Sequence, residues 1–440
     1  MKAMTAAIPP AADDVVELCS ELIRIDTTNT GDPETCAGER AAAEYVAGRL
    51  DEVGIDSVIL ESEPGRANVV ARIAGADRSR PALLVHGHLD VVPASVGEWS
   101  VHPFSGECRD GYLWGRGAVD MKDMDAMTLA VIRNWARTGV TPPRDIVLAF
   151  VADEEHGGRK GARFLVDNHT DLFEGCTEAV SEVGGFSLTI DGQRLYLVQT
   201  AEKGLAWMRL RASGRPGHGS MVHDDNAVTA LCEAVARLGT HEFPMVMTRT
   251  VRQFLEGVSE VLGVEFDPDD VEGTLAKLGS LARIVGATLR NTANPTVVQA
   301  GYKSNVIPSS AEAIVDGRFL PGELAEFERT VDELLGDNVQ REWLIHDQAL
   351  ETDFDGPLVE TMIAALQAED PGARVLPYMM SGGTDAKSFE RLGMRCFGYS
   401  PLQLPPDLDF TALFHGIDER VPIDGLRFGT RVLDRFLRSC

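Results

Sequence analysis

The sequence has no long apolar run and no pattern of paired cysteines. In its 440 residues, no stretch of about 18 consecutive apolar residues occurs, so we expect no membrane-spanning helix. The seven cysteines are scattered and form no C-x-x-C pair, which argues against a thiolate zinc site or a disulfide framework and favours a reducing, cytoplasmic environment. The first residues carry one lysine, Lys2, followed by prolines and acids instead of an apolar segment, so we expect no signal peptide.

Basic residues are fewer than acidic ones. The chain has 41 Lys and Arg against 68 Asp and Glu, which gives a net charge of -27. A charge of this sign repels the phosphates of nucleic acids and anionic lipid surfaces, and no basic run interrupts it. We therefore expect neither a nucleic acid nor a membrane as a partner.

The length and the apolar content predict two domains. With 44% hydrophobic residues over 440 positions, the chain can bury more core than one globular unit usually holds. Up to residue 201, short apolar runs alternate with helical spacing, which is typical of βαβ units and predicts an α/β fold with a doubly wound, parallel sheet. The expected helices cover residues 13–23, 39–53, 121–138 and 160–168, and the expected strands cover residues 68–73, 82–85, 145–151 and 178–181.

The pattern changes at residue 202. Strands at 205–212, 296–300, 311–319 and 339–345 and helices at 226–239 and 323–335 predict a compact α+β unit. Beyond residue 351 the alternation resumes, so we expect one domain made of residues 1–201 plus 351–440 and an inserted domain at 202–350. Residues 241–295 are the hardest to assign, because prolines at 244, 268 and 295 interrupt their helical pattern.

Reactive side chains follow three of the predicted strands. The strand at 82–85 runs into His86-Gly87-His88-Leu89-Asp90, the strand at 145–151 into Asp153-Glu154-Glu155-His156, and the strand at 178–181 into Glu182. A further acid, Asp120, lies in a glycine-rich loop just before a predicted helix. Because ligands bind at the carboxyl ends of parallel strands, we expect these side chains to meet at one edge of the sheet.

Imidazole and carboxylate groups at one edge favour zinc, cobalt or manganese. In an extended segment, His88 and Asp90 project to the same side, so the carboxylate of Asp90 can orient the imidazole of His88. His86 shares that face and is a rival ligand. Of the adjacent acids Glu154 and Glu155, one suits a general base and the other a metal ligand.

Three strings in this order resemble the M20 metallopeptidases, which include aminoacylases, carboxypeptidases, acetylornithine deacetylase and succinyl-diaminopimelate desuccinylase. They are VHGHLDVVP at 85–93, GRGAVDMK at 115–122 and DEEHGG at 153–158. Later strings, KSNVIP at 303–308 and DGRFLPG at 316–322, look like the lid-domain motifs of the same family. The resemblance spans nearly the whole chain and implies a doubly wound mixed-sheet catalytic domain with an inserted α+β lid, through which some members form homodimers.

The resemblance also implies a role for each residue at the predicted edge. It places His88 and Glu182 on one metal ion, Glu155 and His415 on the other, and Asp120 between both. Glu154 becomes the general base, and Asp90, which orients His88, is counted with it among the catalytic residues. His415 is identified by the string LFHGIDE at 413–419, which is similar to the family's last-ligand motif. Composition alone does not distinguish it among ten histidines. The family has a cis peptide after the bridging acid, here Asp120-Met121, and two divalent ions, zinc first, with cobalt or manganese as alternatives.

Other residues match the substrate side of the family's site. His218, in GRPGHGS at 214–220, resembles the lid histidine that stabilises the oxyanion, in dimeric members across the subunit boundary. Asn305 and Arg318 look like binders of the substrate's carbonyl and carboxylate groups. Gly382, Gly383 and Thr384 belong to a loop whose N–H groups can hold a carboxylate. Asp385 follows Thr384 directly, unlike in the desuccinylases, and the sequence after Lys122 also departs from the common continuation.

These observations predict a two-metal hydrolase that cleaves an amide bond in a peptide or N-acyl amino acid with a free carboxylate. Metal-activated water would be the nucleophile and Glu154 the base. Two alternatives stay open. A non-catalytic relative would be expected to lose a ligand or the base, and none is missing. A phosphoesterase would be expected to carry a phosphate-binding glycine loop or a basic cluster.

Overall fold

The computed structural model describes residues 10–268, 270–277 and 285–440. The expectation that no signal peptide is present falls on residues 1–9, outside the described part, as does a portion of the region at 241–295. Two compact units make up the described chain. The first comprises the residues up to Gln199 together with Thr352–Pro377 and Thr384–Cys440, and the second comprises Thr200–Glu351 and Tyr378–Gly383. The sequence-based boundaries assigned Tyr378–Gly383 to the first domain, whereas the structure assigns this segment to the second unit. The backbone N–H of Lys203 donates to the carbonyl of Met380 and holds the segment there.

The central sheet of the first unit is mixed, not parallel throughout. Its strands are β1 (Ser57–Glu63), β2 (Arg66–Ile73), β6 (Ile146–Val151), β3 (Ala82–His88), β7 (Cys176–Ser181), β18 (Arg395–Gly398) and β9 (Gln193–Glu202), in that spatial order. Pairs β6–β3, β3–β7 and β7–β18 are parallel, whereas β1–β2, β2–β6 and β18–β9 are antiparallel. The short turn between β1 and β2 allows only an antiparallel pair, so the parallel prediction holds for the centre of the sheet alone.

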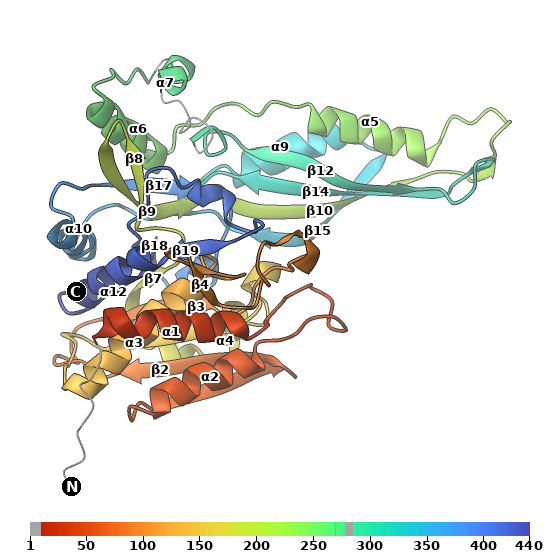
Figure 1. The fold of residues 1–440 in the computed structure, drawn as a ribbon. Coiled ribbons are helices and arrows are strands. Elements are labelled where there is room, and N and C mark those ends of the chain that lie inside the picture. The colour runs from red at the N-terminus through yellow and green to blue at the C-terminus, as the bar shows by residue number, and fades with distance from the viewer. Residues whose placement is uncertain (1–9, 269, 278–284) are drawn as a thin grey trace, which may run out of the picture. The chain divides into compact units, whose positions relative to one another are not determined.

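Helices cover both faces of this sheet. On one side α1 (Ala11–Arg24), α3 (Lys122–Thr138) and α12 (Ile423–Leu437) pack against one another, and α10 (Pro357–Glu369) packs against α12 (Figure 1). α2 (Arg40–Asp51) contacts β1 and β2, and α4 (Ala162–Asn168) packs against α11 (Ala386–Glu390).

Strand β3 shows why two helical layers are needed. The ring of His86 lies 4.6 Å from that of Phe389 in α11, whereas a Cβ atom on Gly87 would lie 2.5 Å from the side chain of Met121, just before α3. Neighbouring residues of a strand point to opposite faces, so α11 and α3 lie on opposite sides of the sheet. Every residue of β3 is buried, as expected for a strand with both faces covered.

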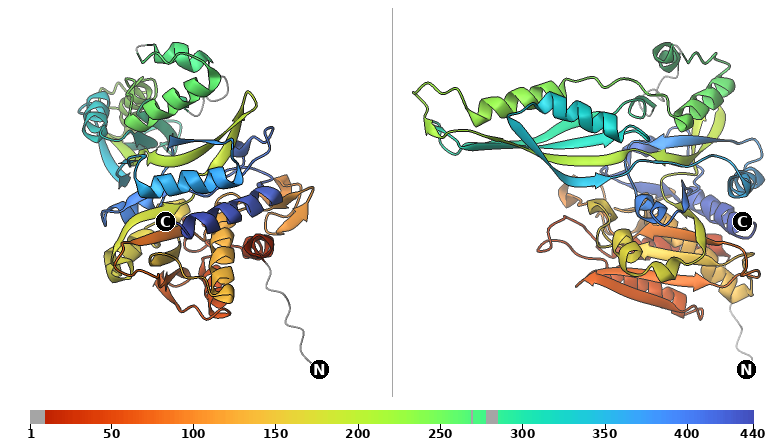
Figure 2. Two further views of the ribbon diagram at one scale, coloured as in Figure 1. Left: turned by 90° about the vertical axis from the view of Figure 1, so that its left-hand side faces the viewer. Right: turned by 180° about the vertical axis from the view of Figure 1, so that it is seen from behind.

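The second unit is built on a four-stranded antiparallel sheet. Its order is β12 (Thr292–Ala300), β14 (Ser310–Phe319), β10 (Gly204–Ser213) and β15 (Val339–Asp347). Figure 2 shows α5 (Ala227–Gly239) and α9 (Leu324–Leu335) lying along the same sheet. Apolar residues alternate along β10 and β14 and form one core with these helices, in agreement with the period of two expected for a half-covered sheet.

The proline-containing region at 241–295 holds a well-formed helix. Helix α6 (Arg249–Leu262) starts after Thr248, whose side chain accepts the N–H of Val251, and ends at Gly263 in the left-handed conformation. Pro244 and Pro268 lie outside it, so they do not break the helix, whose ends are set by Thr248 and Gly263. A shorter helix, α7, covers Val271–Lys277.

Short strands complete the described chain. β8 (Phe186–Ile190), β16 (Leu350–Glu351) and β17 (Arg374–Met380) pair with β9, β11 (Gly217–His218) pairs with β13 (Val306–Ile307), and β4 (Glu107–Arg109), β5 (Tyr112–Trp114) and β19 (Arg420–Pro422) form a small sheet. Among the described residues, no helix combines the length and the apolar content needed to cross a bilayer.

Candidate metal centre

Three strands deliver reactive side chains to one edge of the first unit's sheet. β3 ends at His88, β6 is followed by the single turn Glu154–His156, and β7 is followed by Glu182. Because β3 runs parallel to both β6 and β7, their carboxyl ends lie at the same edge. The expected gathering of these side chains is present.

A small sheet brings the remaining two residues to this edge. β5 precedes the loop that carries Asp120, and β19 follows the loop that carries His415. These strands pair antiparallel, with Trp114 opposite Arg420. The ladder therefore joins two loops that are about 300 residues apart in the chain. The Asp120–Met121 peptide bond is cis, as the resemblance implied.

Asp120 lies between two imidazole rings. Its Oδ1 atom is 3.0 Å from Nε2 of His88, and its Oδ2 atom is 3.2 Å from Nε2 of His415. A carboxylate oxygen of Glu182 is 3.4 Å from Nε2 of His88, and one of Glu155 is 3.2 Å from Nε2 of His415. The donors thus form two groups that share Asp120.

Burial and hydrogen bonds shift the pKa values of the residues in this cluster. Burial raises the pKa of Glu154 well above its usual value and that of Glu155 to about 7. Hydrogen bonds to Asp120 and Glu155 raise the pKa of His415 to about 10. Burial opposes the charge on His88, yet Glu182 and Asp120 raise its pKa well above the usual value. The neighbouring carboxylates thus raise the pKa of both imidazoles.

The donor set fits divalent cations. Carboxylate oxygens and imidazole nitrogens are the ligands that zinc, cobalt and manganese take. The Oε1 atom of Glu155 is buried and accepts no hydrogen bond from the described residues, so it is available to a ligand. His88 with Asp120 and Glu155, and His88 with Glu154 and Glu182, each place donor atoms within 4.8 Å of one another.

Asp90 contacts His88 in a different way from the one expected. The Nδ1 atom of His88 lies 2.9 Å from the backbone carbonyl oxygen of Asp90, whereas the nearest carboxylate oxygen of Asp90 is 3.6 Å away. The carboxylate instead accepts the backbone N–H groups of Glu154 at 3.1 Å and Glu155 at 3.2 Å. Asp90 therefore orients both the imidazole and the turn that carries the two glutamates.

His86 does not join the cluster. It lies one strand repeat, roughly 6.6 Å, before His88 on the same face, away from the sheet edge. Its ring packs against Phe389, and burial lowers its pKa to about 3. Neither ring nitrogen has a hydrogen-bond partner among the described residues. The sequence-based alternative that His86 is the ligand is therefore wrong.

Residues 84–439 match the sequence model of peptidase family M20/M25/M40. The chain belongs to this family. It is a metal-dependent amidohydrolase, and its mixed α/β fold is that of M20 peptidases. The resemblance to the M20 metallopeptidases is thus confirmed.

Relatives cover most of the chain. An N-fatty-acyl-amino acid synthase/hydrolase PM20D1 from Xenopus tropicalis is 30% identical over 440 residues, which covers 92% of this chain and 82% of the relative. Aminoacylase-1 from Sus scrofa is 26% identical and covers 92% of this chain and 90% of its own. The structure of an M20 family metallo-carboxypeptidase from Sulfolobus solfataricus has a TM-score of 0.75 at 19% identity, over 97% of this chain and 99% of that one.

Most of the residues predicted to bind the substrate lie in the second unit. His218, in β11, is exposed, and its Nδ1 atom accepts the N–H of Ser220 at 3.2 Å and lies 2.8 Å from the Ser220 hydroxyl. Nε2 is therefore the nitrogen that carries the proton in the neutral ring. Arg318 forms a two-pronged ion pair with Asp316, at 2.6 and 3.0 Å, and lies 5.7 Å from the ring of Trp207.

The remaining residues predicted to bind the substrate belong to two loops. Asn305 is exposed, and its carbonyl accepts the N–H of Gly219 at 2.9 Å. Gly382 and Gly383 are half-buried and belong to the second unit. Thr384 is buried in the first unit, and its hydroxyl accepts the N–H of Ala386 at 3.2 Å.

The M20 strings contain two residues to which the sequence assigned no role. Glu419 accepts the backbone N–H groups of Val119 at 2.8 Å and Asp120 at 3.2 Å. Arg116 donates to Glu419 at 2.7 Å and to the carbonyl of His415 at 3.3 Å. Both lie inside the quoted strings, so the signal was there. Their partners are too distant in the chain for spacing to reveal the contact.

Proposed function

We propose that this M20 amidohydrolase uses two divalent metal ions to cleave an amide bond in a small peptide or N-acyl amino acid that carries a free carboxylate. The observation that carries the proposal is the position of Asp120, whose two oxygens face His88 and His415. Each imidazole has its own carboxylate neighbour, Glu182 or Glu155. Two equivalent donor groups around one shared carboxylate suit a pair of ions.

The five side chains divide between two ions. His88 and Glu182 would hold one, His415 and Glu155 the other, and Asp120 both. We propose zinc, with cobalt or manganese as alternatives, because the donors are imidazole and carboxylate groups. When bound, such a pair lowers the pKa of water and polarises a carbonyl group.

Glu154 is the proposed general base. One of its oxygens lies 4.0 Å from Nε2 of His88, and its backbone N–H is held by Asp90. In this role the carboxylate takes a proton from the attacking water and delivers it to the nitrogen of the leaving amine. Burial, which raises its pKa, favours the protonated form that the second step needs.

The residues of the second unit suggest how the substrate is held. The protonated Nε2 atom of His218 suits a developing oxyanion, and the guanidinium of Arg318 suits a carboxylate. Asn305, Gly382, Gly383 and Thr384 would bind the substrate's carbonyl and carboxylate oxygens. The names of the relatives, an N-fatty-acyl-amino acid hydrolase and an aminoacylase, support this class of substrate.

The function is tested with the metal-loaded protein and three substrate classes: N-acetyl amino acids, dipeptides and p-nitrophenyl phosphate. We expect hydrolysis of amides and none of the phosphate ester. Glu154→Gln should keep two metal ions per chain and lose nearly all turnover, whereas Asp120→Ala should lose metal as well. Glu174→Gln, an exposed glutamate, is the control. Parental turnover by Glu154→Gln would show that the base is another residue.

A homodimer and a cytoplasmic location complete the proposal. β12 is an edge strand of the second unit, and its Val297 and Val298 are 42% and 55% exposed, so a second copy could pair with it. The seven cysteines are all free, which suits a reducing compartment. Light scattering should give a molecular mass twice that of the chain. Val298→Lys should reduce this mass to that of a single chain.

A further inference from the structure

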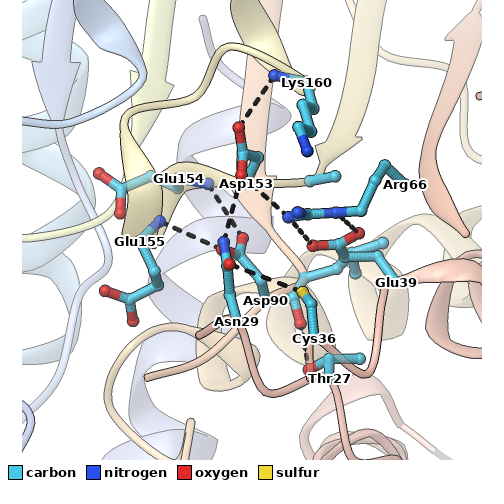
Figure 3. Close-up of polar contacts among 12 residues, drawn as sticks. Thr27, Asn29, Cys36, Glu39, Arg66, Asp90, Asp153, Glu154, Glu155 and Lys160 are labelled. Atoms are coloured by element: carbon cyan, nitrogen blue, oxygen red, sulfur yellow. Dashed lines mark hydrogen bonds and ion pairs between the residues drawn. The ribbon is translucent and has the colours of Figure 1, made fainter. Parts of the chain in front are cut away.

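A buried polar network holds the turn that carries Glu154 and Glu155. Figure 3 shows the two glutamate side chains extending to one side, with Asn29 and Asp90 in the middle and Arg66 on the other side. Residues Asn29, Glu39, Arg66, Asp90 and Asp153 of this network are between 0% and 6% exposed. None of Asn29, Glu39 and Arg66 belongs to a motif quoted above.

The turn needs this support at the residue that precedes it. Asp153 has a φ of 70°, the left-handed region that residues other than glycine adopt at a cost. Its carboxylate accepts hydrogen bonds from Arg66 at 3.0 Å, from Asn29 at 3.3 Å and from the backbone N–H of Lys160 at 3.0 Å. These bonds fix the point at which the turn leaves β6.

Asn29 joins the two carboxylates on either side of the turn. Its Nδ2 group donates to Asp90 at 2.8 Å and to Asp153 at 3.3 Å. Asp90 in turn accepts the N–H groups of Glu154 and Glu155. One amide group therefore links the carboxylate that precedes the turn to the carboxylate that holds the first two N–H groups of the turn.

The orientation of the Asn29 amide is determined by its surroundings. Its Oδ1 atom accepts the N–H of Gly31 at 3.0 Å, which leaves Nδ2 to face the carboxylates. Its backbone N–H donates to the carbonyl of Val91 at 2.8 Å, so the residue is tied to the segment after β3. An aspartate at position 29 could not donate a hydrogen bond to Asp90 or to Asp153, because a carboxylate has no donor.

The charges of the network make the amide important. Glu39, Asp90 and Asp153 are buried acids, and Arg66 is the cation that contacts two of them, Glu39 at 2.6 Å and Asp153 at 3.0 Å. Asp90 is joined to this group only through the neutral amide of Asn29, within the contacts found among the described residues. A further negative charge at position 29 would face two carboxylates at hydrogen-bond distance.

We propose that Asn29 is a positioning residue, which acts through Asp90 and Asp153 to hold Glu155 for its metal ion and Glu154 for proton transfer. The inference rests on the proposed function for the roles of the two glutamates. Asn29 is not one of the proposed metal ligands or substrate binders. Residues of this kind typically change metal affinity or activity by about 10–100-fold when they are replaced.

The test compares Asn29→Asp and Asn29→Ser with Asn168→Asp, an exposed asparagine that undergoes the same charge change. Cobalt(II) titration followed by visible absorbance reports the two metal affinities, and steady-state kinetics report kcat and KM separately. We expect Asn29→Asp to weaken one of the two cobalt affinities by about 10–100-fold and to lower kcat with little change in KM. Asn29→Ser, which keeps a donor, should lie closer to the parent, and Asn168→Asp should match it.

Unchanged cobalt affinities in Asn29→Asp would overturn the inference. An equal loss at both cobalt sites, together with a lower melting temperature, would also overturn it, because Asn29 would then support the fold as a whole. If Asn29→Asp does not fold, Asn29→Ser and Arg66→Lys give the same two measurements. The cobalt titration does not depend on the base, so failure of the proposed role of Glu154 is seen separately, as parental turnover in Glu154→Gln.

Discussion

Arg116 and Glu419 form a buried ion pair across 303 positions of the chain, with Nη1 and Oε2 2.7 Å apart. The other oxygen of Glu419 accepts the backbone N–H groups of Val119 and Asp120. The pair thus fixes the loop that presents the bridging carboxylate of the proposed metal centre.

Replacement of Glu419 should weaken both the fold and the metal centre. Glu419→Ala leaves the guanidinium of Arg116 buried without its carboxylate, which typically lowers the free energy of unfolding by about 3–5 kcal/mol. Urea denaturation of the metal-free protein measures this change, and metal analysis measures the bound ions. Glu419→Gln keeps an acceptor and should lose less. If Glu419→Ala retained parental stability and two metal ions, the ion pair would have no part in holding the Asp120 loop.

Metal binding should release protons at neutral pH. Hydrogen bonds to Asp120 and Glu155 raise the pKa of His415 to about 10, so its imidazole is protonated at pH 7 in the metal-free chain. A metal ion must displace this proton, and its affinity should therefore increase as the pH rises towards 10. Calorimetric titrations in buffers of different ionisation enthalpy count the protons released. Affinity that stays constant between pH 6 and pH 9 would contradict this prediction.

The metal-free protein should lose stability between acidic and neutral pH. Burial raises the pKa of Glu39 from 4.5 to about 7, so the folded state holds this proton more tightly than the unfolded state does. Such a group stabilises the fold fully below pH 4.5, and its contribution disappears as the pH rises through about 7. Urea denaturation at pH 5 and pH 7 measures the difference. Glu39→Gln, which cannot titrate, should show a smaller difference between the unfolding free energies at the two pH values. An equal difference in both proteins would count against Glu39 as the source.

His218 should affect turnover without affecting metal content. His218 belongs to the second unit, whereas the proposed ligands belong to the first, and its protonated Nε2 is suited to an oxyanion. Loss of one such donor usually lowers kcat by about 100–1000-fold. His218→Ala is therefore expected to bind two ions and to turn over slowly, whereas His241→Ala, a histidine of the same unit, serves as the control. A parental kcat in His218→Ala would remove the residue from the mechanism.

The sequence predicted the centre of the fold better than its borders. The buried strands at 82–85 and 145–151 are mainly apolar; the structure extends the first to Ala82–His88 and begins the second one residue later, at Ile146–Val151. The antiparallel strand β1 was not expected, because its only apolar run, Val58-Ile59-Leu60, is short and is flanked by polar residues. Helix α6 was obscured by the flanking prolines, although Thr248 and Gly263 mark its ends.

The proposed ligands at strand ends could be predicted from the sequence, whereas the position of His415 and the contacts of Asp90 could not. His88, Glu155 and Glu182 lie at or just after the ends of buried strands, so topology alone brings them together. His415 comes to the site through the pairing of β5 with β19, a long-range contact that leaves no trace in local spacing. The part played by Asp90 depends on the bend after β3, which decides whether its carbonyl or its carboxylate faces His88.

The ladder between β5 and β19 also has a consequence for synthesis on the ribosome. A growing chain makes His88, Asp120, Glu155 and Glu182 in its first half, but the ion that His415 would hold cannot be fully enclosed until residue 415 has emerged and β19 has paired. Incomplete polypeptides would then lack the paired cations, so the hydrolytic activity would begin only once translation has passed this point.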